Sequence, residues 1–292
     1  MLHHYDDPFG DSSAVPTGQV SKYAAESVKM VLTGDGGDEV LSGYTIYQGE
    51  KFANTYQKLP QMLQSSIPQV LGIAEGMLPG GMRRKAVRAV KVTEASAQDF
   101  EDRLIAKISW GNHGLVRELL ASSSESLVSM QDYVRNLMSA CPYKDPFYRL
   151  MYFNLKESLP NDMLVKVDRM SMAHSLETRV PFLDHRLVEL MVHVHKNVKM
   201  DGYQRKSVLR RTIAQRLPQE LLHAPKRGFS VPMAKWFGDP EFNGDLNTLK
   251  SASLGFSGSK LDDIFQSTQS GGRDYGHLLW ILFVLQRWMG RS

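Results

Sequence analysis

An acidic, glycine-rich run follows the clearest strand candidate of this chain. The strand is predicted over residues 29–33, and the run GDGGDE, residues 34–39, comes directly after it. In an open α/β sheet, ligands bind beyond the carboxyl ends of the strands. A glycine-rich turn there lets backbone N–H groups approach phosphate closely, and a carboxylate can hold a hard cation such as Mg²⁺. The run therefore predicts a metal–polyphosphate site at this strand end.

The spacing of the run excludes several common phosphate and cation motifs. It lacks the third glycine of the dinucleotide fingerprint, the Gly-Lys-Ser/Thr of a P-loop and the sixth-position glycine of an EF-hand. The alternative is a tight strand-to-helix turn whose acids only cap the following helix. Two capping acids would suffice without three glycines, so the ligand site is the favoured interpretation.

A second group of charged residues lies in LPNDMLVKVDRMSMAHSLETRVPFLD, residues 159–184. On a helix, Asp162 and Lys166 are four positions apart and share a face. Asp168 lies next to Arg169 in the same segment. These acids are either site residues or partners in surface ion pairs, which are worth only about 0.3–0.5 kcal/mol each.

Two further segments combine charges with turn residues. Glu177 and Arg179 precede the Pro-Phe-Leu run 181–183, and we expect them to form a buried ion pair that holds a corner. Lys226 lies in APKRGFSVP, residues 224–232, where a rigidly presented ammonium group suits a phosphate or a developing oxyanion. The alternative for Lys226 is an exposed loop lysine.

Around these segments the sequence predicts an α/β protein that is predominantly helical. A helix over residues 18–27, with Thr17 as its N-cap, leads to the strand at 29–33, and no second strand stands out. The helix nearest the site is expected over 163–176, and a preceding helix is expected to end before Pro160. Residues 239–272 are expected to be the least structured, and the apolar segment 278–288 to be a buried helix. Other helical patterns cover residues 38–59, 61–77, 82–91, 96–110, 115–120, 126–140, 146–159, 184–195 and 206–216.

Composition argues against several classes of protein. The net charge of +4 comes without a basic patch interleaved with aromatic residues, so nucleic acid is not an expected partner. The longest strongly apolar run, residues 278–285, is too short to span a bilayer, and the first residues lack a signal-peptide pattern. The single cysteine, Cys141, cannot form an internal disulfide. We expect a cytoplasmic protein with no membrane partner, which could form a homo-oligomer.

Three segments, in this order, resemble one known family. They are GDGGDE with Gly43-Tyr44, then LETRVPFLD at residues 176–184, then PKRGF at residues 225–229. Together they resemble the synthetase domain of the glutamine-hydrolysing asparagine synthetases over nearly the whole chain. β-Lactam synthetases and other amide-forming relatives share this layout, so the motifs specify the acid less well than the reaction. The resemblance implies a partial ATP-pyrophosphatase domain with a large helical portion, and residues 1–292 as one synthetase-like domain.

The chemistry that the resemblance implies is adenylation followed by amide formation. The side-chain carboxylate of aspartate attacks the α-phosphate of ATP–Mg²⁺, and ammonia from glutamine then displaces AMP. Asp35 matches a residue that faces the intermediate, where asparagine synthetases usually have glutamate, so another carboxylate substrate is the alternative. A further site acid matches Asp162, with Asp168 as the competing choice. By similarity, Asp38 is a Mg²⁺ ligand, Lys226 stabilises charge on the phosphates and the intermediate, and the nucleotide also faces Gly34, Gly36 and Gly37.

Two parts of the family pattern do not occur in this sequence. The family normally begins with a glutaminase domain whose nucleophile is an N-terminal cysteine, whereas Met1 begins this sequence and Cys141 is internal. The pyrophosphate loop, Ser-Gly-Gly-x-Asp-Ser, should precede Asp7 and does not occur there. We therefore expect residues 1–292 alone to be inactive in amide formation, either as the C-terminal part of a longer synthetase or as a non-catalytic remnant.

Overall fold

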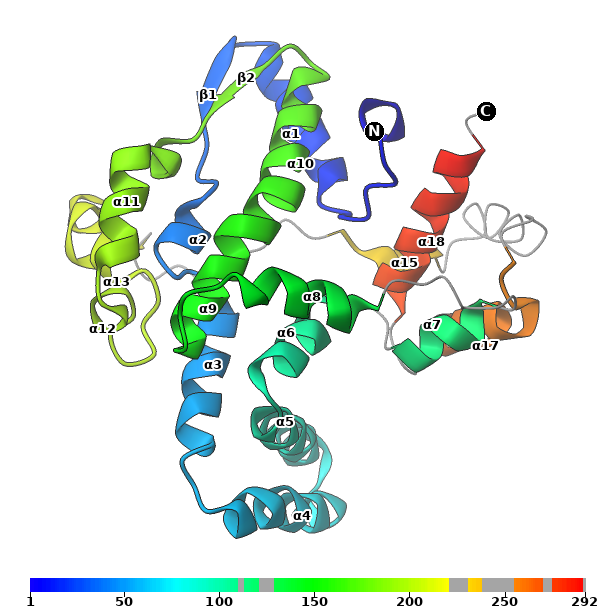
Figure 1. The fold of residues 1–292 in the computed structure, drawn as a ribbon. Coiled ribbons are helices and arrows are strands. Elements are labelled where there is room, and N and C mark those ends of the chain that lie inside the picture. Colours follow the sequence, from blue (N-terminus) through cyan, green and yellow to red (C-terminus); the bar gives the residue numbers. More distant parts are fainter. Residues whose placement is uncertain (110–112, 121–128, 221–230, 238–254, 270–274, 291–292) are drawn as a thin grey trace.

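The computed structural model describes residues 1–109, 113–120, 129–220, 231–237, 255–269 and 275–290. It is a helix-rich α/β fold, as expected (Figure 1). The elements, in chain order, are η1 (Leu2–His4), α1 (Ala14–Ala25), β1 (Met30–Leu32), α2 (Gly37–Val40), α3 (Thr45–Tyr56), α4 (Gln61–Met77), α5 (Gly80–Ala97), α6 (Phe100–Ile108), α7 (His113–Leu119), α8 (Met130–Ser139), α9 (Pro146–Phe153), η2 (Asn154–Met163), α10 (Leu164–Met172), β2 (Glu177–Arg179), η3 (Pro181–Leu183), α11 (His185–His193), α12 (Lys196–Lys199), α13 (Ser207–Arg211), η4 (Ile213–Arg216), α15 (Met233–Phe237), α17 (Gly258–Gln269) and α18 (Gly276–Met289).

The strand β1 is parallel to a second strand, β2, which the sequence did not reveal. Val31 lies opposite Thr178, and the backbone N–H of Thr33 donates to the carbonyl of Arg179 at 2.9 Å. The acidic, glycine-rich run therefore follows the carboxyl end of a parallel strand, which confirms that prediction.

The prediction that Glu177 and Arg179 form a buried ion pair is wrong. The two side chains do pair, at 2.7 Å, but they are 57% and 60% exposed. They occupy alternate positions of β2 and so share one face of the strand. That face points to solvent, while Thr178 between them is half-buried.

Several helices begin at acids that the sequence supplies as caps. Asp99 accepts from the N–H of Asp102 at the start of α6, and Asp145 accepts from Phe147 at the start of α9. Asp184 does the same for α11. Each carboxylate satisfies a backbone donor that has no partner within the helix, so these helix starts are encoded locally.

Other element boundaries differ from expectation. The first long helix begins at Ala14, so Thr17 lies inside it and donates to the carbonyl of Ser13 at 2.7 Å. The pattern over residues 38–59 divides into α2 and α3. Residues 258–269, expected to be irregular, form α17.

The chain also stays helical through Pro160. This proline lies inside η2, a π-helix over Asn154–Met163. Proline has no N–H and clashes with the preceding turn of an α-helix. The wider π-turn is one way in which a helix accommodates such a break.

The structure contains separate buried clusters, and the helices that join in each lie in different parts of the ribbon (Figure 1). One joins α3, α6, α8 and α9, and it includes Tyr47, Leu104 and Leu150. Another joins α7, α15, α17 and α18, and it includes Leu261 and Leu279. The predicted burial of the terminal apolar helix is thereby confirmed. No helix in the described ranges is both long enough and apolar enough to cross a membrane.

Candidate functional site

In the turn between β1 and α2, packing requires glycine at two positions. Gly36 has φ +78°, and a Cβ there would lie 2.1 Å from a methyl carbon of Leu183. A Cβ at Gly37 would lie 3.1 Å from the ring of Phe182. Gly34 is different, because a Cβ added there meets nothing within 4 Å. The Pro-Phe-Leu segment thus holds the turn from one side, and Gly34 is the glycine with open space beside it.

Asp38 forms an ion pair with Lys206, a residue that the sequence did not single out. Lys206 Nζ lies 2.8 Å from Asp38 Oδ1, and both side chains are partly exposed. Gly43 makes the close approach possible, because a Cβ at that position would lie 1.9 Å from Asp38 Oδ1 and 2.3 Å from Lys206 Cε. Lys206 itself has φ +54°, and the side chain of Arg205 donates to the carbonyl of Gly43. Glycine at position 43 is a local signal for this contact, but no local pattern indicates Lys206.

Glu39 has a different environment from its neighbour. Its side chain is buried and accepts a hydrogen bond from the Tyr44 hydroxyl at 2.5 Å. Burial raises the pKa of Glu39, and the nearby charges of Asp38 and Asp35 add to this effect. Asp35 and Asp38 are each half-buried. The turn therefore presents Asp38 near the surface and keeps Glu39 inside as a hydrogen-bond acceptor.

Asp162, at the end of the π-helix, joins a second charged group. Lys166 Nζ donates to Asp11 Oδ2 at 2.7 Å and to Ser13 Oγ at 2.8 Å. Asp162 is hydrogen-bonded to Asp11, and burial together with the Asp11 charge raises the pKa of Asp162 to about 6. Burial would also raise the pKa of Asp11, but the charge and hydrogen bond of Lys166 bring it below its usual value. Below about pH 6, Asp162 is therefore the protonated member of this carboxyl pair.

The carboxyl pair lies in an open cleft of about 910 Å³. Asp11, Asp162 and Arg169 are among its lining residues. The sequence pointed to Asp162 but not to Asp11. The run DSS beginning at Asp11 lacks the glycines of the family's pyrophosphate loop, so no local pattern singled out Asp11.

The structure brings the strand-end turn and the π-helix together. The turn helix α2 packs against η2, and the charge of Glu39 contributes to the raised pKa of Asp162. Asn154 of the same π-helix donates to the hydroxyl of Tyr47 at 3.0 Å. Asp168 is exposed on α10, a helix that packs against α1 and β2. The geometry therefore associates Asp162 with the turn more closely than Asp168.

Lys226 lies outside the described residues, so its predicted place beside the turn stays a prediction.

The side chains near the turn indicate how a metal ion could bind there. Among the described residues no group of three His, Cys, Asp or Glu side chains could enclose a metal ion. Mg²⁺ commonly uses one or two carboxylates and completes its coordination with water and substrate phosphate. Asp38 fits that mode of binding and does not fit a protein cage.

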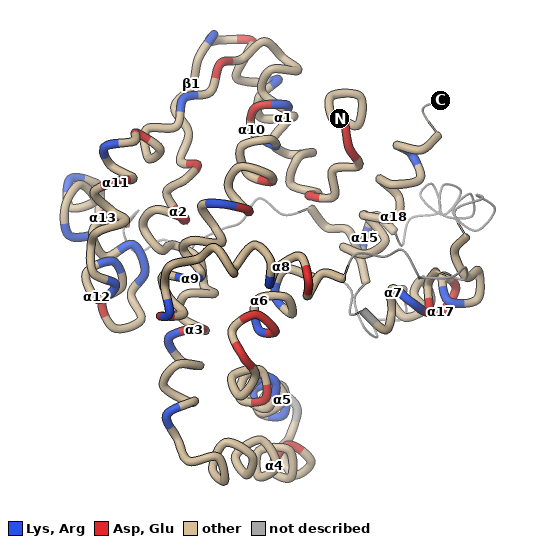
Figure 2. The backbone as a smooth tube through the Cα atoms, in the orientation of Figure 1, with Lys and Arg blue, Asp and Glu red and all other residues tan. Residues whose placement is uncertain are grey.

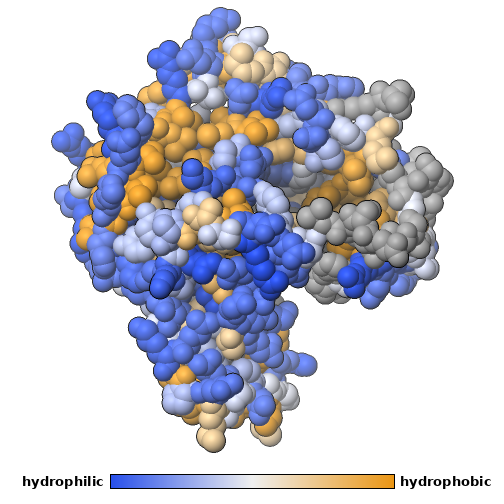
Figure 3. All heavy atoms as spheres, viewed as in Figure 1, coloured by the Kyte–Doolittle hydropathy of each residue, from blue (hydrophilic) through white to orange (hydrophobic). Residues whose placement is uncertain are grey.

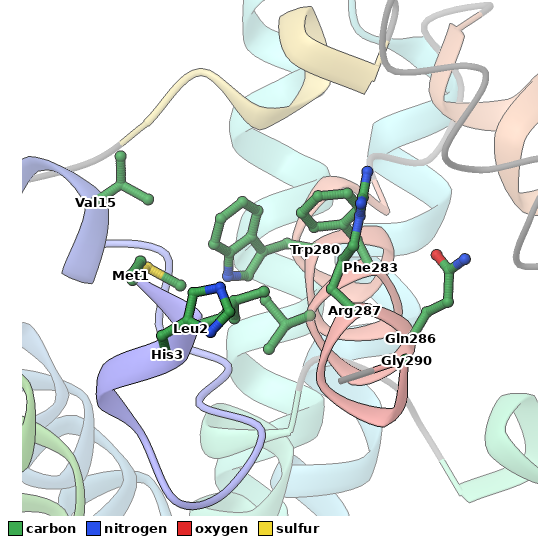
Figure 4. A pocket seen from close by; sticks show the side chains of 10 residues that line it. Met1, Leu2, His3, Val15, Trp280, Phe283, Gln286, Arg287 and Gly290 are labelled. Carbon is green, nitrogen blue, oxygen red and sulfur yellow. The ribbon is translucent and has the colours of Figure 1, made fainter. Parts of the chain in front are cut away.

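A separate apolar pocket lies between the N-terminal residues and α18 (Figure 4). It has a volume of about 690 Å³, and Leu2, Trp280 and Phe283 are among its lining residues. None of the site residues predicted from the sequence lines it. The candidate site is therefore the surroundings of the β1–α2 turn.

Comparisons with known proteins agree with the order of motifs. The profile of the asparagine synthase family matches residues 1–290. A putative glutamine-hydrolysing asparagine synthetase of Mycobacterium tuberculosis (strain H37Rv) is 30% identical over 300 residues, covering 99% of this chain and 43% of the relative. Asparagine synthetase (glutamine-hydrolysing) 1 of Bacillus subtilis is 28% identical over 236 residues, covering 81% of this chain and 36% of the relative. "Amidase chry2" of Gibberella zeae is 22% identical over 249 residues, covering 74% of this chain and 34% of that protein. The chain thus spans less than half the length of these relatives.

Proposed function

This chain belongs to the asparagine synthase family, and we propose that it forms the synthetase part of an ATP-dependent amide ligase. The observation that carries the proposal is the strand-end turn, which contains the open Gly34 and leads to Asp38 in its ion pair with Lys206. A carboxylate and an ammonium group at this place suit a metal-bound polyphosphate, because the first attracts the cation and the second the phosphate oxygens.

The proposed reaction has two steps. An oxygen of the substrate carboxylate attacks the α-phosphorus of ATP, and the bond from that phosphorus to the bridging oxygen breaks as pyrophosphate leaves. Ammonia, supplied from glutamine, then attacks the acyl carbon, loses a proton and displaces AMP. Mg²⁺, when bound, neutralises charge on the phosphates. Asp38 would hold it, and Lys206 and Lys226 would face the phosphate oxygens.

We propose that Asp162 acts on protons rather than on the metal. Its carboxyl group is hydrogen-bonded to Asp11, and burial together with the Asp11 charge raises its pKa to about 6. A group that titrates near neutral pH can give or take a proton during amide formation.

The first candidate for the carboxylic acid substrate is aspartate, because several relatives are named asparagine synthetases. Asp35 favours a second candidate, a different carboxylate, because it stands where asparagine synthetases usually have glutamate. Its side chain is shorter by one methylene group and leaves more room at the site.

The test is carboxylic-acid-dependent release of pyrophosphate from ATP–Mg²⁺ with ammonia present. It uses the longest polypeptide encoded in frame with residues 1–292, a panel of acids that includes aspartate, and the Asp38→Asn and Lys206→Met variants. We expect release with one acid of the panel and a loss of about 10²–10³ in rate in Asp38→Asn. Asp132→Asn, at an exposed position of α8, is the matched control and should keep its activity. A complete protein that releases no pyrophosphate with any acid would overturn the proposal.

A further inference from the structure

The ion pair between Asp38 and Lys206 involves the same carboxylate that the proposed function assigns to the metal. Lys206 Nζ lies 2.8 Å from Asp38 Oδ1, and the two side chains are 30% and 22% exposed. A carboxylate that contacts an ammonium group binds a second cation less well, because two positive charges so close together repel each other. Lys206 therefore opposes a metal ion at Asp38 for as long as the ion pair is closed.

Apolar packing holds the segment of Lys206 against the turn helix. Val208 and Leu209 of α13 pack against a buried apolar cluster. Val40 and Leu41, at the end of α2, belong to that cluster. Figure 3 shows hydrophobic residues gathered where α2 lies in the view of Figure 1. The two segments are thus joined by contacts that do not depend on the ion pair.

Hydrogen bonds fix the backbone just before Lys206. Gln48 of α3 donates to the carbonyl of Tyr203 at 2.6 Å, and Arg205 donates to the carbonyl of Gly43 at 2.9 Å. The lysine side chain itself is a flexible four-carbon stem with a charged end. The ammonium group of Lys206 can therefore leave Asp38 by rotation of its side chain, without movement of the backbone.

The segment that carries Lys206 is strongly basic. Residues 196–211 include several Lys and Arg residues and a single acid, Asp201. Figure 2 shows Lys and Arg concentrated along α12 and α13. Such a concentration of positive charge attracts anions, and phosphate oxygens are good acceptors for an ammonium group. A bound polyphosphate would thus give Lys206 a partner other than Asp38.

We propose that this ion pair couples the binding of the metal to the binding of the polyphosphate. Lys206 restrains Asp38 before either ligand binds, and its ammonium group turns to the phosphate oxygens when the polyphosphate arrives. The inference rests on the proposed function, which assigns Asp38 to Mg²⁺ and Lys206 to the phosphates. Each ligand engages the residue that opposes the other ligand, so each raises the affinity for the other by the same factor.

The test is the affinity for Mn²⁺ in the absence of phosphate, measured by electron paramagnetic resonance of the free ion. Mn²⁺ is the probe because, like Mg²⁺, it prefers oxygen ligands. The protein is the in-frame polypeptide of the pyrophosphate test. We expect Lys206→Met to bind Mn²⁺ at least about tenfold more tightly than wild type, a typical size for coupling between sites. The same variant should release pyrophosphate more slowly, because it has lost a contact with phosphate.

Further variants show whether the gain arises at Asp38. Adding Asp38→Asn to Lys206→Met should remove the gain, and Lys206→Arg, which keeps the charge, should bind Mn²⁺ like wild type. Lys196→Met is the matched control, because it frees Asp145 from an ion pair of similar exposure, 29% and 32%. It should leave the affinity for Mn²⁺ unchanged. Circular dichroism checks that every variant is folded.

The possible failures of the coupling and of the proposed function differ. Mn²⁺ binding in Lys206→Met that is equal to or weaker than in wild type would overturn the coupling, even where Asp38→Asn lowers the affinity and so supports the metal site. A gain that survives in the double variant would also overturn it, because another carboxylate would then be responsible. Mn²⁺ binding that Asp38→Asn never changes would contradict the proposed metal site, and the coupling with it.

Discussion

Among single residues, Asp162 gives the clearest prediction of how stability depends on pH. Its pKa of about 6 lies above the ordinary value of 3.8 because the carboxyl group is buried beside Asp11. Between about pH 4 and 6 the folded state keeps a proton that the unfolded state releases. The contribution of Asp162 to the free energy of unfolding is therefore present at low pH and lost as the pH rises through 6.

The measurement is urea unfolding at several pH values between 4 and 7, compared between wild type and Asp162→Asn. The amide keeps the shape and cannot ionise, so the decline due to this group should disappear in the variant. Asp168→Asn, an exposed change on α10, should keep the decline. Identical pH dependence in wild type and Asp162→Asn would show that the carboxyl pair does not hold the proton.

Alanine variants of Gly36 and Gly34 test whether packing requires glycine at position 36 but not at position 34. Gly36→Ala meets both a positive φ and Leu183, so we expect a loss of about 1–3 kcal/mol in the free energy of unfolding. Gly34→Ala meets no atom and should change stability by less than about 1 kcal/mol. Thermal or urea unfolding of the pair measures the difference. Equal losses would contradict the packing role of Gly36.

At the scale of elements, α3 and α6 are joined by a buried ion pair. Arg103 Nη2 lies 2.6 Å from Glu50 Oε2, and both side chains are 2% exposed. Lys107 also contacts Glu50, at 3.1 Å. Glu50→Gln leaves the guanidinium buried without its counter-charge, so we expect a loss of about 3–5 kcal/mol in stability.

The control for this prediction is Glu75→Gln, which removes the pair between the partly exposed Glu75 and the exposed Arg83. That change should cost less than about 1 kcal/mol. Urea unfolding of both variants is the measurement. A small loss in Glu50→Gln would show that water reaches Arg103 or that the helices separate at little cost.

At the scale of the whole molecule, Lys199 is a buried basic residue that contacts the core formed by α3, α6, α8 and α9. Its side chain is fully buried, and Nζ lies 3.0 Å from the sulfur of Met151. Burial lowers the pKa of Lys199 from 10.5 to about 8. Between about pH 8 and 10.5 the unfolded state binds a proton that the folded state does not. The contribution of Lys199 to stability therefore rises with pH across this window.

Lys199→Met should remove this rise and stabilise the protein at pH 7 by about 1 kcal/mol or more, because no charge then has to be buried. The free energy of unfolding between pH 7 and 10 measures both effects. Lys22→Met, at an exposed position of α1, is the control. A variant less stable than wild type at pH 7 would show that the ammonium group has a favourable partner in the core.

Local patterns were enough to predict much of this protein. The strand with its glycine-rich turn, the boundaries of α4 and the burial of α18 all follow from spacing and composition within one segment. The order of three motifs was enough to indicate the family, and the family profile bears it out. Such features depend on neighbours within a few positions, where backbone geometry alone relates the residues.

Only the tertiary structure decided which distant residues meet. Lys206 reaches Asp38 because Gly43 leaves room for both, and Asp11 reaches Asp162 because the N-terminal segment packs against the π-helix. β2 escaped notice because three residues with two exposed side chains show no apolar alternation. Its identity as a strand comes from hydrogen bonds to β1, which no local pattern records. The sequence indicated the turn motif, but Lys206, which pairs with Asp38, comes from a distant segment that only folding brings beside the turn.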